Sequence, residues 1–209
     1  MPPSTPVPAS LMERKRRLVQ QRIIKAADEL FAAEGFDSVS VSDIAARADV
    51  GRTTFFRYFG DKAEVVFAKE QEMLDAIAAF AAQASVGIAQ TASEAVEQLR
   101  PIVLLLCAQA TADLQAYAHH CQLLEQHLEL RARDALKMQQ IADKLSEVLT
   151  GRGTDETTAV FAAQIALACY QTAKRRANTA GALTDKTRAA FEQALALGHR
   201  MTSTRESTE

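Results

Sequence analysis

The stretch VSDIAARADVGRTTFFRYFGDK, from Val41 to Lys62, decides the fold of this chain. It holds two short helical segments, one beginning after Ser40 and the other over about 52–59, with the turn Asp49-Val50-Gly51 between them. A longer amphipathic segment precedes both. Two short helices joined by a tight turn behind a longer helix are typical of the helix-turn-helix, whose second short helix lies in the major groove of DNA.

The turn restricts which side chains are allowed near it. Ala45 is small where the two helices cross closely, and Val50 is the apolar residue that fills the turn. Ile44 and Phe55 are predicted to wedge between these helices and the longer one. Ser40 and Asp43 have the spacing of a capping box at the start of the first short helix.

The longer helix is predicted from apolar residues at helical spacing between Leu11 and Glu34. Gly35 follows at the C-cap position, where a positive φ costs a glycine least. Phe36 then folds back on the last turn.

The quoted stretch resembles the signature of the TetR family. Members usually read there as Val, two variable residues, Ile-Ala, a small residue and Val, then Thr-Leu-Tyr-x-x-Phe and a Lys. The upstream segment Ala26–Phe36 resembles the first helix of the family, so that the likeness covers roughly residues 18–70.

This resemblance implies which side chains contact double-stranded DNA. Arg52, Thr53 and Thr54 match the start of the recognition helix, and an arginine there can donate two hydrogen bonds to a guanine. Ser42, Tyr58 and Lys62 match positions that contact phosphates. The predicted interface comprises Ser42, Arg52, Thr53, Thr54, Phe56, Arg57, Tyr58 and Lys62.

Phe56 departs from the family pattern, which usually has a tyrosine there. The phenol of that tyrosine binds a phosphate, and a phenylalanine has no group to do so. The contact is therefore either lost or taken over by another side chain such as Arg57.

The N-terminal segment is basic although the formal net charge of the chain is −2. Residues 1–25 carry six basic side chains against Glu13 alone. Such local charge points to a polyanion contact, with a solvated tail as the alternative. We expect a group of four basic residues to follow the DNA backbone or enter the minor groove: Arg14, Lys15, Arg16 and Arg17.

The remainder predicts helices and no β-hairpin, which gives an all-α protein of about nine helices. Asp61 is expected to cap one long fourth helix through Phe80 that joins the two domains. The expected organisation is a disordered leader at 1–10, a helix-turn-helix domain at 11–62, a helical ligand-binding and dimerisation domain at 63–201, and a frayed tail at 202–209.

The resemblance also implies a homodimer through the last two helices, about 155–178 and 184–201. A single short recognition helix contacts few bases, so a palindromic operator read by a twofold dimer is the usual solution. Small residues allow close helix approach, either at that interface or inside the chain's own core: Ala159, Ala162, Ala163, Ala166 and Ala173.

The middle helices are expected to enclose a cavity for a small-molecule effector, with ordinary core packing as the alternative for any one residue. The candidate lining is Leu104, Leu105, Cys107, Ala108, Leu114, Tyr117, Leu124, Leu128, Ile165 and Tyr170. The segment Leu123–Arg133 resembles a TetR subgroup associated with acyl-CoA-like ligands, including regulators near mycofactocin clusters. That likeness would bring Lys174, Arg175 or Arg176 near a phosphorylated head group.

The predicted function is a ligand-responsive repressor that a small apolar or acyl-type effector releases from DNA. One alternative is a constitutive DNA-binding protein without ligand control. The other is a helical enzyme, for which the sequence offers no ordered Ser/His/Asp set, no glycine-rich phosphate loop and no HExxH motif.

Composition excludes several other classes. No apolar run approaches the roughly 18–20 residues that cross a bilayer, and the Pro/Ser-rich start lacks the apolar region of a secretory signal. We therefore expect a cytoplasmic protein with no membrane partner. No cofactor is expected. Three histidines gather near Cys121, but no carboxylate or second cysteine completes a tetrahedral set, so no metal site is expected; they are His119, His120 and His127.

Overall fold

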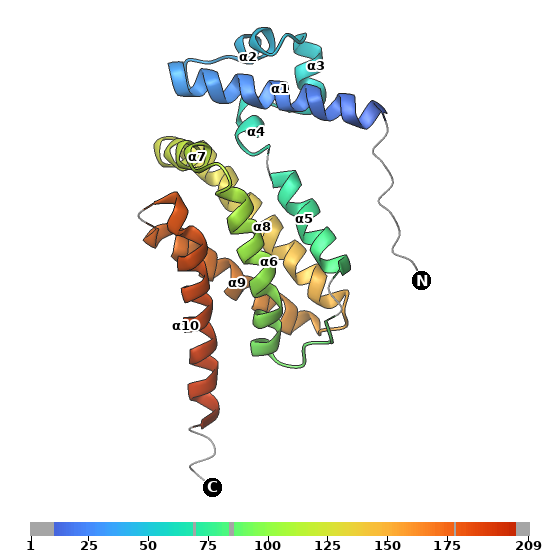
Figure 1. The fold of residues 1–209 in the computed structure, drawn as a ribbon, viewed down its shortest axis with the longest axis vertical. Helices are drawn as coiled ribbons and strands as arrows, with labels where there is room; N and C mark the ends of the chain where they lie inside the picture. Colours follow the sequence, from blue (N-terminus) through green and yellow to red (C-terminus); the bar gives the residue numbers. More distant parts are fainter. Residues whose placement is uncertain (1–10, 69, 84–85, 178, 204–209) are drawn as a thin grey trace. The chain divides into compact units, whose positions relative to one another are not determined.

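The computed structural model describes residues 11–68, 70–83, 86–177 and 179–203 (Figure 1). Within these ranges the chain forms ten α-helices and one short 3-10 helix, and no strand. The all-α fold class is confirmed. The predicted leader and most of the predicted tail lie outside the described residues.

The chain divides into two compact units, Met1–Ala68 and Lys69–Glu209. The first unit holds four helices, which are α1 (Leu11–Glu34), α2 (Val41–Arg47), α3 (Arg52–Tyr58) and α4 (Lys62–Val66). The second unit holds α5 (Glu70–Gln83), α6 (Ala92–Ala110), α7 (Leu114–Gln126), α8 (Leu128–Thr150), α9 (Glu156–Arg176), η1 (Ala180–Ala182) and α10 (Leu183–Ser203).

The first unit is built on the apolar stripe of α1, which packs against α2 and α4. Ile23 and Phe31 of this stripe are fully covered. Gly35 ends the helix with φ +82°, the left-handed conformation predicted for it. Phe36 is buried beyond it, with its ring centroid 5.1 Å from that of Phe31. The turn after α1 thereby packs Phe36 into the core of the first unit, against the last turns of α1.

The long fourth helix predicted after Asp61 is wrong as a single element. Asp61 does cap a helix, accepting a hydrogen bond from the Glu64 N–H at 2.9 Å, but α4 ends at Val66. The next N–H groups, those of Phe67 and Ala68, bond three residues back instead of four. This tighter turn breaks the helical ladder at a point where the Phe67 side chain is buried.

The second unit has α9 at its centre, packed against α6, α8 and α10. Polar residues cap these helices at their N-termini, because Thr91, Asp113 and Asp155 accept backbone hydrogen bonds at the starts of α6, α7 and α9. The core between the helices is aliphatic, with Leu99 and Leu145 among its fully buried side chains.

The alanines of α9 belong to this core. Ala159, Ala162, Ala163, Ala166 and Ala173 are all buried within the single chain. Of the two uses that the sequence left open for them, the structure shows close packing against the chain's own helices. An intermolecular surface on α9 must therefore use other residues.

Within the described ranges, no helix combines the length and the apolar character needed to cross a membrane.

Candidate nucleic-acid interface

The turn between α2 and α3 is tight and bonded within itself. Asp49 takes the left-handed conformation with φ +53°, which an aspartate tolerates better than most side chains. The Val50 N–H donates to the Ala45 carbonyl at 3.0 Å. Ile44, Ala45 and Phe55 are buried, as predicted for the crossing of the two helices.

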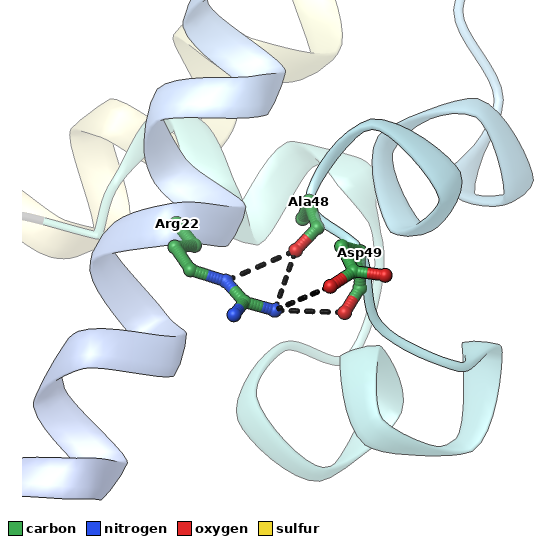
Figure 2. A network of polar contacts seen from close by, with 3 residues as sticks. All are labelled: Arg22, Ala48 and Asp49. Atoms are coloured by element: carbon green, nitrogen blue, oxygen red, sulfur yellow. Dashed lines mark hydrogen bonds and ion pairs between the residues drawn. The ribbon is translucent and has the colours of Figure 1, made fainter.

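Arg22 of α1 holds this turn from outside (Figure 2). Its guanidinium donates to the Ala48 carbonyl at 2.7 and 3.1 Å and to the Asp49 carbonyl at 2.7 Å. The Asp49 carboxylate lies 4.0 Å away. Arg22 thus satisfies carbonyls that the end of α2 leaves without helical partners. In the sequence Arg22 is one of six basic residues of the N-terminal segment, and nothing in its local pattern reveals a partner 26 residues away.

The capping box predicted at the start of α2 is confirmed. The Asp43 N–H donates to Ser40 Oγ at 3.2 Å, and the Ser40 N–H donates to Asp43 Oδ2 at 2.8 Å. Hydrogen bonds from the side chain and backbone of Ser40 hold the pKa of the Asp43 carboxyl below its usual value. Ser42 stands exposed next to this box, on the first turn of α2.

Helix α3 separates its side chains into a buried side and an outer side. Phe55 and Phe59 face the core, with ring centroids 5.8 Å apart. The outer side carries four exposed predicted contact residues, Arg52, Thr53, Phe56 and Arg57. Thr54 and Tyr58 are partly covered. The structure therefore gathers these six residues on one short helix, with the guanidinium groups and a threonine hydroxyl free to meet a duplex.

Lys62, predicted to contact a phosphate, makes hydrogen bonds within the protein. Its ammonium donates to the carbonyls of Phe36 at 2.6 Å, Val39 at 2.9 Å and Asp37 at 3.4 Å. It also lies 4.4 Å from the centre of the Phe36 ring. An ammonium has three donors, so a phosphate contact would require Lys62 to give up a carbonyl. In this structure it ties the loop after α1 to the start of α4.

The predicted basic arm forms the first turns of α1. Arg14, Lys15, Arg16 and Arg17 are all exposed there. The Arg16 guanidinium carbon lies 6.0 Å from the centre of the Tyr58 ring. The contact places the Arg16 side chain of α1 beside Tyr58 of α3.

The predicted effector-lining residues differ in burial within the second unit. Ala108, Leu114 and Leu128 are exposed, whereas Cys107 and Leu124 are buried in the core. The remaining members, which are half-buried, are Leu104, Leu105, Tyr117, Ile165 and Tyr170. A groove of about 180 Å³ lies between α8 and α9, and none of the predicted residues lines it.

A polar cluster between α7, α8 and α9 does include two of these residues. Lys174 donates to Asp134 at 3.1 Å, and both side chains are largely covered. Burial raises the pKa of the Tyr117 and Tyr170 phenols and of the Cys121 thiol. The Tyr117 hydroxyl is fully buried without a hydrogen-bond partner of acceptable geometry. Lys174 therefore has a carboxylate partner, while Arg175 and Arg176 are exposed.

His119, His120, Cys121 and His127 do not assemble into a metal centre in the described part of the chain, where no three His, Cys, Asp or Glu side chains come together to hold an ion.

The fold and the outer face of α3 define a helix-turn-helix protein. The model for bacterial regulatory proteins of the tetR family matches residues 23–68. Residues 23–68 of this chain therefore carry the DNA-binding region of the TetR family. The matched family and relatives are transcriptional regulators, not enzymes.

Two curated relatives resemble the chain over a limited stretch. The HTH-type transcriptional regulator TcmR of Streptomyces glaucescens is 42% identical over 62 residues, which are 30% of this chain and 27% of that protein. The proposed mycofactocin biosynthesis transcriptional regulator MftR of Mycobacterium tuberculosis is 47% identical over 53 residues, 25% of this chain and 27% of that protein. The chain thus spans about a quarter of each relative. The subgroup resemblance of Leu123–Arg133 stays a prediction.

Two solved structures share the fold over most of the chain. SmeT, in its complex with triclosan, superposes with a TM-score of 0.56 at 17% identity, covering 86% of this chain and 90% of that one. A protein of Mesorhizobium loti assigned to the TetR family gives a TM-score of 0.52 at 20% identity, covering 90% and 98%. These likenesses concern the fold alone.

Proposed function

We propose that the chain is a sequence-specific regulator that inserts α3 into the major groove of double-stranded DNA. The observation that carries the proposal is the outer face of α3, where Arg52, Thr53 and Arg57 are exposed while Phe55 anchors the opposite face. The turn that presents this face is held by Arg22 through two backbone carbonyls. A rigid helix with free hydrogen-bond donors is what base recognition requires.

The contact residues divide by chemistry. Arg52 supplies two parallel donors to a guanine edge, and Thr53 and Thr54 supply a hydroxyl and a methyl group. Ser42, Tyr58 and Arg57 reach phosphates that set the register. The exposed cations of the first turns of α1 extend the contact along the backbone.

The direct test is selection of binding sites from random duplexes with the full chain, followed by anisotropy measurements on the selected site. Arg52→Ala should weaken binding about fivefold to 150-fold per half-site and relax selection at one base pair. Replacing Arg14, Lys15, Arg16 and Arg17 by alanine should flatten the salt dependence, because each lost phosphate contact removes about one unit of slope.

Arg131→Ala is the matched control, since Arg131 is an exposed arginine of α8 that donates to the Glu125 carbonyl at 3.3 Å. It should bind as the unchanged protein does. A protein that selects no sequence, even at low salt, would refute the proposal.

We further propose a homodimer through α9 and α10 that reads a palindromic operator. Support comes from apolar side chains left exposed on these helices, Val160 and Phe161 on α9 and Leu197 on α10. Phe161→Glu should convert the dimer to a monomer in light scattering after size exclusion. Leu136→Glu, at an exposed leucine of α8, is the control that should stay dimeric. The reverse result would move the interface to α8.

The regulator is proposed to act as a repressor that a small apolar or acyl-type effector releases. Support comes from the buried polar cluster that contains the Tyr117 hydroxyl, and from the exposed Arg175 and Arg176, which suit an anionic head group. An effector releases DNA only by binding the DNA-incompetent state more tightly.

Calorimetry with a panel of acyl-CoAs and free fatty acids, paired with anisotropy on bound DNA, tests the effector. Heat together with DNA release supports it. DNA binding that no ligand changes would favour a constitutive binder.

A further inference from the structure

One aromatic side chain projects from the outer face of α3. Phe56 is 49% exposed although its neighbours Phe55 and Phe59 are buried. Among the described residues of Met1–Ala68, the other large exposed hydrophobic side chains are Leu11, Met12 and Leu18, all at the start of α1. Phe56 is therefore the one exposed aromatic ring in the described part of this unit, and it stands on the helix proposed to enter DNA.

The ring is held in place from below. Its centroid lies 5.6 Å from that of Phe55, and the two planes meet at 86°, the edge-to-face arrangement that aromatic pairs favour. Phe55 itself is fully buried. The exposed edge of Phe56 is thus a pre-oriented surface, whose docking costs little side-chain entropy compared with a flexible arginine or lysine.

The surroundings of Phe56 are polar. Arg52 lies four residues earlier and Thr53 three residues earlier, so both share the face of Phe56 on the helix. Arg57 is exposed beside it. The polar neighbours of Phe56 can bind base edges and phosphates. If DNA covers this whole face of α3, the Phe56 ring must contact an apolar group of the DNA.

Major-groove chemistry offers one such partner. A phenylalanine has no donor for phosphate, and wedging between base steps is a minor-groove mode. The apolar group that bases present in the major groove is the C5-methyl of thymine. We propose that Phe56 is a specificity-determining residue that contacts a thymine methyl beside the base read by Arg52. This inference rests on the proposed DNA binding.

The experiment removes the methyl group alone. Each thymine of the selected site is replaced in turn by deoxyuridine, symmetrically in both half-sites, and binding of the full chain is measured by anisotropy. At one thymine position, each methyl group removed should weaken binding by the unchanged protein roughly fourfold. Because both half-sites are substituted, the palindromic site should bind about fifteenfold more weakly. Phe56→Ala should bind thymine and uracil sites alike, and Phe56→Leu should keep part of the difference.

Two further variants identify which side chain is responsible. Arg57→Ala should weaken both sites equally and keep the uracil effect. If the uracil effect disappears in Thr53→Ala but persists in Phe56→Ala, then Thr53 reads the methyl and the inference is overturned. Circular dichroism melting checks that Phe56→Ala folds, as expected for an exposed position.

The outcomes separate this inference from the proposed function. A protein that selects a site but is indifferent to uracil at every thymine, or that selects sites without thymine, overturns the role of Phe56 alone. A protein that selects no site overturns both.

Discussion

In Met1–Ala68 two long basic side chains bind backbone carbonyls near the surface, whereas in Lys69–Glu209 a group of polar side chains is enclosed between three helices. Arg22 and Lys62 represent the first arrangement, each donating to more than one carbonyl. Tyr117, Asp134 and Lys174 represent the second, and the buried Tyr117 hydroxyl has only the Tyr170 hydroxyl and the Cys121 thiol as polar neighbours. The first arrangement restrains the backbone that presents the outer face of α3. The second leaves polar groups in the interior that a ligand could bind.

This difference teaches where each unit can respond to its surroundings. The α2–α3 turn is restrained both by hydrogen bonds of its own N–H groups and by hydrogen bonds from Arg22. It therefore presents α3 in one orientation. The buried cluster relies on weak neighbours for the Tyr117 hydroxyl, and a poorly satisfied buried donor is costly. A ligand or a rearrangement that gives Tyr117 a stronger acceptor would be favourable. We therefore expect rigidity in the first unit and adaptability in the second.

The largest effect should come from breaking the core under α3. Phe55→Ala should destabilise the first unit by about 3–5 kcal/mol. DNA binding should then be lost, while the helices of Lys69–Glu209 keep their protection from hydrogen exchange. Leu145→Ala, in the core of the second unit, should produce the converse pattern. If either variant removes protection from both units together, the two units unfold as one and the comparison fails.

The next effect should come from the ion pair of the buried cluster. Lys174→Met leaves Asp134 largely covered without its cation and should lower the free energy of unfolding by about 2 kcal/mol. The double variant Asp134→Leu, Lys174→Met should recover much of that loss, because no unpaired charge remains. Urea denaturation measures both. Equal stability of the single and double variants would mean that the pair is solvated.

A smaller effect is expected at the turn. Arg22→Ala removes the hydrogen bonds to the Ala48 and Asp49 carbonyls and should cost about 1–2 kcal/mol of unfolding free energy, together with weaker DNA binding. Arg47→Ala is the matched control, since Arg47 only pairs with Glu29 on the surface at 2.7 Å and should cost less than about 1 kcal/mol. Similar losses in both variants would remove the special role of Arg22.

The smallest effect concerns acid stability, to which each unit contributes a helix-capping aspartate with a lowered pKa. Hydrogen bonds from Ser40 lower the pKa of Asp43, and hydrogen bonds from Thr158 and its neighbour lower that of Asp155, in both cases from 3.8. A carboxyl with a depressed folded pKa stabilises the fold above its unfolded pKa. That stability is lost as the pH falls through the folded pKa.

Asp43→Asn should therefore reduce the acid sensitivity of the first unit alone, and Asp155→Asn that of the second. Melting curves from about pH 5 down to about pH 2 measure this. A change in both units from one substitution would show that the caps are coupled.

Sequence alone determined where the helices of the helix-turn-helix begin and turn, and which of their residues are buried. The capping box of Ser40 and Asp43, the positive φ of Gly35 and the burial of Ile44, Ala45 and Phe55 are all confirmed. These features depend on residues within a few positions of one another. Local backbone preference and periodicity are therefore sufficient to predict them.

Only the tertiary structure decided what joins distant segments. It showed that Arg22 donates hydrogen bonds to the α2–α3 turn and that Lys62 donates to the carbonyls after α1. It also showed that Lys174 pairs with Asp134. It also ended the fourth helix at Val66, where the pattern of apolar residues continues but the backbone tightens and Phe67 enters the core. Such contacts follow from how helices pack in three dimensions, and packing between residues tens of positions apart leaves no period or spacing in the sequence.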